Sequence, residues 1–120
     1  MQSRTSAQNA TATVARDGAT VVKGIRLEQH TNDAPVLYLQ VFNHASPTVG
    51  TTAPATVLQV PAGSTKVEFA RLAAQFQGAF GGLHLATALS YAVTTTHDGL
   101  TAPDAGDEPV VVVDYEKIGA

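Results

Sequence analysis

The sequence predicts an all-β protein: an antiparallel β-sandwich, jelly-roll-like, with a polar N-terminal arm. Short runs rich in β-branched and aromatic residues recur along the chain, and turn residues rather than long helical patterns separate them. Two of these runs are apolar on both faces, which is typical of strands that are covered on both sides. Residues 1–18 are instead rich in Ser, Thr, Asn, Gln and Ala, and they close at the turn dipeptide Asp17-Gly18.

The chain has 120 residues, which is enough for one domain with a core of its own. We therefore expect an extended arm over residues 1–18 and a single β-sandwich domain over residues 19–120. The arm has two possible uses, and the sequence leaves both open. It can lie as an edge strand on its own domain, or a neighbouring chain can hold it as an added strand.

The expected strands begin soon after the arm. Gly24 lies inside the first of them and predicts a bulge or a close backbone approach. Residues 83–94 are long enough for one bent strand or for two, whereas residues 70–82 predict a loop with at most one short helix. The full set of expected strands is residues 20–29, 36–42, 56–60, 66–69, 83–94 and 110–116.

Two strands carry more apolar surface than a simple sandwich needs. Residues 36–42 are apolar apart from Gln40, and residues 110–113 are consecutive valines. A second apolar face predicts a second cover, which is either a subunit interface or the rest of the chain wrapped around a central strand. The residues that we expect near a dimer or trimer contact are Val36, Tyr38, Phe42, Val110 and Val112.

Composition excludes several partners. Charged residues make up 14% of the chain, against about 25% in an average soluble domain, and the net charge is -3 with the basic residues scattered. We therefore expect no direct nucleic-acid binding and no binding to a membrane. The N-terminus lacks the apolar core of a signal peptide, so we expect synthesis and release in the cytoplasm. The absence of cysteine excludes disulfides and thiolate metal sites.

No catalytic motif is present. The four histidines, His30, His44, His84 and His97, do not follow a metal-ligand spacing, although His84 lies in an apolar strand and can point into the sandwich or an interface. Asp98, Asp104, Asp107 and Glu108 share one loop whose spacing differs from that of an EF-hand, and cation binding there stays open. Neither a Gly-x-Ser-x-Gly motif nor a phosphate-binding glycine loop occurs. We expect no enzyme activity, no cofactor and no metal.

A family resemblance adds to these observations. Its elements, in chain order, are an aromatic strand with Tyr38 and Phe42, residues 45–51, residues 61–63, residues 89–96, and residues 101–103 before the last valine-rich strand. In this order they resemble the small β-sandwich structural proteins of tailed bacteriophages and prophages. The arm lies outside the resemblance, and residues 70–82 are more helix-prone than it implies.

The resemblance implies a virion protein, and the low charge favours a capsid decoration or cement protein that binds the outer surface of the shell. Its implied partners are the major capsid protein or other virion proteins, and it would form a homo-oligomer. One alternative is a neck, tail or head-fibre component. Another is a soluble module that binds a small ligand or a glycan, although no Trp and only three Tyr are available for stacking.

Overall fold

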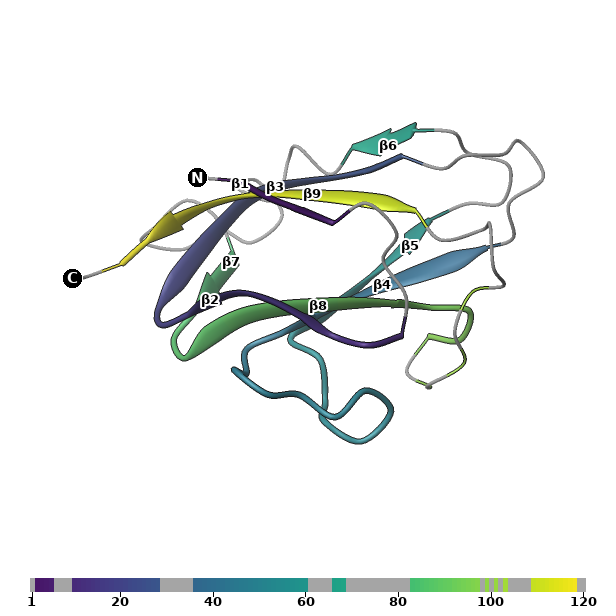
Figure 1. Ribbon diagram of the computed structural model, residues 1–120, viewed down its shortest axis with the longest axis horizontal. Coiled ribbons are helices and arrows are strands. Elements are labelled where there is room, and N and C mark those ends of the chain that lie inside the picture. Colours follow the sequence, from purple (N-terminus) through teal and green to yellow (C-terminus); the bar gives the residue numbers. More distant parts are fainter. Residues whose placement is uncertain are drawn as a thin grey trace.

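The computed structural model describes residues 2–5, 10–28, 36–60, 66–68, 83–97, 99, 101, 103 and 109–118 (Figure 1). The loop expected at residues 70–82, His30 and the four acidic residues between 98 and 108 lie outside them. The described residues hold nine β-strands and no helix. The strands are β1 (Gln2–Thr5), β2 (Thr13–Asp17), β3 (Thr20–Glu28), β4 (Leu37–Phe42), β5 (Thr56–Val60), β6 (Lys66–Glu68), β7 (Leu83–Leu85), β8 (Ala88–Thr94) and β9 (Val110–Lys117).

The strands form two antiparallel sheets that face each other across the core (Figure 1). Sheet A has the order β1-β9-β3-β6, and β7 also pairs with β3, whereas sheet B has the order β2-β8-β4-β5. β6 pairs with one end of β3, at Arg26 to Glu28, and β7 pairs with the other end, at Thr20 to Val22. The predicted antiparallel β-sandwich is confirmed.

The strand order is that of a jelly roll. The pairs β4·β5, β3·β6, β2·β8 and β1·β9 nest around the connection between β4 and β5, as in one long hairpin. Rolling this hairpin up brings β9 beside β3 and β8 beside β4, which closes the two sheets. The segment predicted as an arm supplies two of the rolled strands, β1 and β2. Each of these strands lies at the edge of a different sheet.

A bulge in β3 keeps its apolar residues in the core. Val22 and Ile25 are an odd number of positions apart, so on a regular strand they would face opposite sides. The register against β9 shifts between Val22 and Gly24, so one extra residue, Lys23, lets both Val22 and Ile25 face inward. The bulge predicted at Gly24 is therefore confirmed.

Two short turns carry the chain from one sheet to the other. Gly18 and Ala19 join β2 in sheet B to β3 in sheet A, and Gly18 adopts a φ of 146°. That φ is one that side chains rarely adopt, which explains the glycine. Ala86 and Thr87 join β7 in sheet A to β8 in sheet B. The segment 83–94 is thus two strands, one in each sheet.

The core between the sheets is continuous and apolar. Each inner strand contributes alternate residues to it, as the pleat requires. Sheet A supplies Val22, Ile25, Leu27, Leu83, Leu85, Val111, Val113 and Tyr115, and sheet B supplies Leu37, Leu39, Val41, Val60, Leu89, Tyr91 and Val93. The remaining residues of these strands point outward, and they form the outer faces of the two sheets.

Candidate interaction surface

A loop of the same chain covers part of the outer face of sheet B. Phe42 and Ala92 point away from the central core, and both are fully buried, together with Val49 from the loop between β4 and β5. Ala12 packs against the same cluster. This loop, residues 43–55, lies below sheet B in Figure 1. The second cover predicted for Phe42 is therefore provided by the chain itself.

Hydrogen bonds hold this loop to the strands. The Asn43 Oδ1 accepts the backbone N–H groups of Thr87, at 2.8 Å, and of Ala88, at 3.3 Å, and so fixes the turn between β7 and β8. The Ser90 hydroxyl donates to the His44 carbonyl from inside the sheet. The loop is thus anchored at its start to β8, which makes it a fixed part of the surface.

A second segment covers the outer face beside the first. The Gln40 side chain is fully buried, and its Nε2 donates to the Thr94 Oγ1 at 2.9 Å and to the Gly99 carbonyl at 3.1 Å. Because a carbonyl can only accept, the bond to Gly99 determines which end of the amide faces it. The Gln40 Oε1 has no hydrogen-bond partner among the described residues. The Thr94 hydroxyl in turn donates to the Thr96 carbonyl at 2.7 Å.

Tyr38 and His97 extend this contact toward the solvent. Their ring centroids are 5.7 Å apart and the rings are inclined by 72°, an edge-to-face arrangement. Tyr38 is half-buried and His97 is exposed. We use the name loop layer for residues 43–55, 95–97, 99 and 101, which together lie over the outer face of sheet B.

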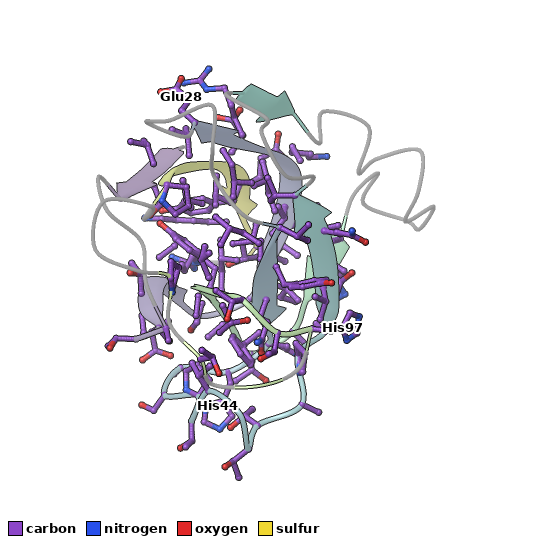
Figure 2. All side chains as sticks on the ribbon, turned by 90° about the vertical axis from the view of Figure 1, so that its right-hand side faces the viewer. Glu28, His44 and His97 are labelled. Atoms are coloured by element: carbon purple, nitrogen blue, oxygen red, sulfur yellow. The ribbon has the colours of Figure 1, made fainter. Side chains whose placement is uncertain are left out.

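Among the residues that the structure describes, the loop layer and strands β4, β5 and β8 contain no charged residue, whereas β2 of the same sheet contains Arg16 and Asp17, and Asp98 follows His97 in the sequence. No Asp, Glu, Lys or Arg occurs in residues 36–60 or in residues 83–97. The outward positions of β3 and β9 in sheet A are different, since both signs of charge occur there. Those charged residues are Arg26, Glu28, Asp114 and Glu116. Figure 2 shows Glu28 on the side of sheet A and His44 at the opposite side, beyond sheet B.

The arm edge of the sandwich is closed by two tyrosines. The Tyr91 hydroxyl of sheet B lies 2.8 Å from the Ser3 hydroxyl of β1, which belongs to sheet A. The Tyr115 hydroxyl of sheet A donates to the Ala15 carbonyl of β2, which belongs to sheet B, over 3.4 Å. Each tyrosine thus reaches from a core position to the edge strand of the other sheet. These contacts tie β1 and β2 to the domain.

The five residues predicted near an oligomer contact differ in how much surface they retain. Phe42, Val110 and Val112 are buried within the single chain, with exposed fractions of 0, 6 and 5%. Val36 and Tyr38 are half-buried. A partner could therefore contact Val36 and Tyr38 directly, and the assignment of an interface to these residues stays a prediction.

The three histidines that the structure describes, His44, His84 and His97, do not form a site. His44 is exposed, and its Nδ1 accepts the Ser46 N–H at 2.8 Å. His84 is also exposed, between the buried Leu83 and Leu85, so the expectation that it can point into the sandwich is wrong. Pleat alternation explains this orientation, because leucines at both neighbouring positions take the core face. The described residues contain no group of three His, Asp or Glu side chains that could hold a metal ion.

Two residues important to this surface were not singled out from the sequence. Val49 lies in a loop rich in Thr, Ala and Pro, where no periodicity distinguishes a buried position. Ser3 lies in the polar arm, and nothing in its neighbours points to Tyr91. Gln40 was noticed as the one polar residue in an apolar run, which is the signal that a buried polar residue leaves in a sequence.

The fold and surface together define a class of protein, a jelly-roll β-sandwich with loops packed over the outer face of one sheet. Comparison of the chain with protein-family models, with curated proteins and with solved structures found no match. The described residues contain no helix that is long and apolar enough to cross a membrane.

Proposed function

We propose that this protein is a structural component of a tailed-phage particle, which binds the outer surface of the capsid shell and stabilises it. The observation that carries the proposal is the jelly-roll strand order, an architecture that recurs in viral capsid domains. Because one fold serves many functions, fold alone is not enough. The resemblance of residues 36–115 to phage structural proteins supplies the second support.

The loop layer is the surface that suits contact with a capsid. Charged residues are depleted from the centres of protein interfaces, because burying an unpaired charge costs free energy. The described residues of the loop layer include no Asp, Glu, Lys or Arg, and hydrogen bonds of Asn43, Ser90 and Gln40 anchor these loops to the strands. A weak contact made by each copy, repeated over a closed shell, adds up to strong stabilisation.

Counting copies in the purified particle tests this role. Quantitative mass spectrometry would compare this chain with the major capsid protein of the phage or prophage that encodes it. Hundreds of copies per particle support a decoration protein. A dozen or fewer would place the chain in the neck, tail or a head fibre, and no copies would leave a binding module for another ligand.

A pair of variants tests the proposed capsid-facing surface. Ala53 is exposed in the loop layer, and Ala53→Glu should lower the occupancy of the protein on purified capsids by at least tenfold. Lys117→Gln changes the net charge by the same amount at an exposed position of sheet A and should leave occupancy unchanged. Equal occupancy for the two variants would move the contact away from the loop layer.

A further inference from the structure

The pairing of β1 with β9 joins the two ends of the chain. The register places Gln2 opposite Asp114 and Thr5 opposite Val111, so β1 covers the edge of β9 that β3 does not. A hydrogen bond between the hydroxyls of Ser3 and Tyr91 accompanies this pairing. In the chain, residues 6–12 connect β1 to β2.

This connection is longer than a crossing between the sheets requires. Stacked sheets lie about 10 Å apart, and two residues are enough for a crossing at Gly18 and Ala19 and again at Ala86 and Thr87. Residues 6–12 also connect the two sheets, from β1 in sheet A to β2 in sheet B. Fully extended, they span about 25 Å. The connection can therefore reach a β9 edge outside its own molecule.

The arm is also suited to leaving its own domain. Residues 1–12 contain Met1 as their one large apolar residue and Arg4 as their one charged residue. A released arm would thus expose little apolar surface to water. The cost of release is mainly the short β1·β9 pairing itself, and the same pairing is regained on another copy.

We propose that β1 exchanges between copies, so that residues 2–5 of one molecule pair with β9 of a second copy of this chain. The second copy offers the same edge, the same register and the same tyrosine hydroxyl. Because both arrangements make the same bonds, local concentration and connection length decide between them. This inference deepens the proposed role and rests on it, since copies crowded on a shell meet at high local concentration.

Mixing two single-cysteine variants tests the exchange, and the absence of native cysteine makes the readout clean. Gln2 and Asp114 are partners in the register, at a spacing that a disulfide can bridge. We expect Gln2→Cys and Asp114→Cys, mixed at high concentration under mild oxidation, to form a covalent heterodimer on a non-reducing gel. The yield should exceed by at least fivefold that of Gln2→Cys mixed with Lys117→Cys, because Lys117 lies beyond the β1 register.

The double variant Gln2→Cys/Asp114→Cys, oxidised when dilute, reports the pairing within one copy. A disulfide within that monomer, combined with a heterodimer yield no higher than in the Lys117→Cys control, would overturn the exchange. Failure of both disulfides would overturn it as well, because the register would then be wrong. Exchange in solution without copies in the particle would instead contradict the proposed capsid role alone.

Discussion

The outer faces of the two sheets differ in what covers them. On sheet B the chain covers itself: residues 43–55 fold over Phe42, and Gly99 receives a hydrogen bond from the buried Gln40. On sheet A the outward positions of β3 and β9 include buried valines. They also include charged residues, which are half-buried on β3 and exposed on β9. The comparison shows that an apolar outer face does not by itself require a partner subunit. A loop of the same chain serves the same purpose, at least for Phe42.

The largest effect is expected from a charge placed on the buried part of sheet A. Val112 is 5% exposed and lies on the outer face of β9. We expect Val112→Asp to abolish folding or assembly, because burying a carboxylate at this position costs free energy even with Arg26 opposite it in the register. Circular dichroism and size-exclusion chromatography would measure this. Asp114→Val, two positions along the same strand and exposed, is the control and should fold normally. Normal assembly of Val112→Asp would show that β9 is misplaced.

A smaller but still large effect on stability is expected at the outer face of sheet B. Phe42 is fully buried against Val49 and Ala92. We expect Phe42→Ala to lower the free energy of unfolding by about 3–5 kcal/mol, since it leaves a cavity under the loop. Urea denaturation followed by fluorescence or circular dichroism would measure the change. Val49→Ala removes less volume from the same cluster and should cost less. A change below about 1 kcal/mol for Phe42→Ala would mean that the loop does not cover this face.

A moderate effect is expected from the buried amide. Gln40→Met keeps the side-chain length but removes the donor to the Thr94 hydroxyl and the Gly99 carbonyl. We expect the free energy of unfolding to fall by about 1–3 kcal/mol, because two acceptors lose a partner. Gln59→Met is the matched control on the neighbouring strand β5, where Gln59 is exposed. Equal effects for the two variants would contradict the buried network.

The smallest effect is expected on the charged part of sheet A. The Arg26 Nε lies 3.2 Å from the Glu28 Oε1, close enough for an ion pair but outside hydrogen-bond geometry, and both side chains are more than a third exposed. We expect Arg26→Ala to change the free energy of unfolding by less than about 1 kcal/mol, because solvent screens such pairs. A double-mutant cycle with Glu28→Ala at low and high salt would measure the coupling. Coupling well above this value would contradict a solvated face.

Four of the strands could be predicted closely from the sequence because their apolar runs are bounded by turn residues. The predicted runs at residues 20–29, 36–42, 56–60 and 110–116 agree with β3, β4, β5 and β9 within one residue at either end. The strands of the arm were harder to predict, because edge strands such as β1 need few apolar residues. Their pairing with β9 and β8 depends on contacts about a hundred and about eighty positions away, which no local pattern contains.

The surface was less predictable than the strands. The apolar outer face of residues 36–42 was recognised, but its cover could not be identified, because Val49 lies in a loop without periodicity. The orientation of His84 was also missed, since the division of residues 83–94 between two sheets decides which of its faces is buried. Periodicity identifies which residues share a face, whereas the partner of that face is set by the fold.

The pairing of the two chain ends has a consequence for synthesis on the ribosome. β1 is synthesised before its partner β9, so at about 5–20 residues per second roughly 5–20 s pass between the two strands. β3 also lacks one of its neighbours until then, because β9 lies between β1 and β3 in sheet A. The jelly roll can therefore close only after β9 has been synthesised. Nascent chains on the same messenger would meet while their first strands are still unpaired.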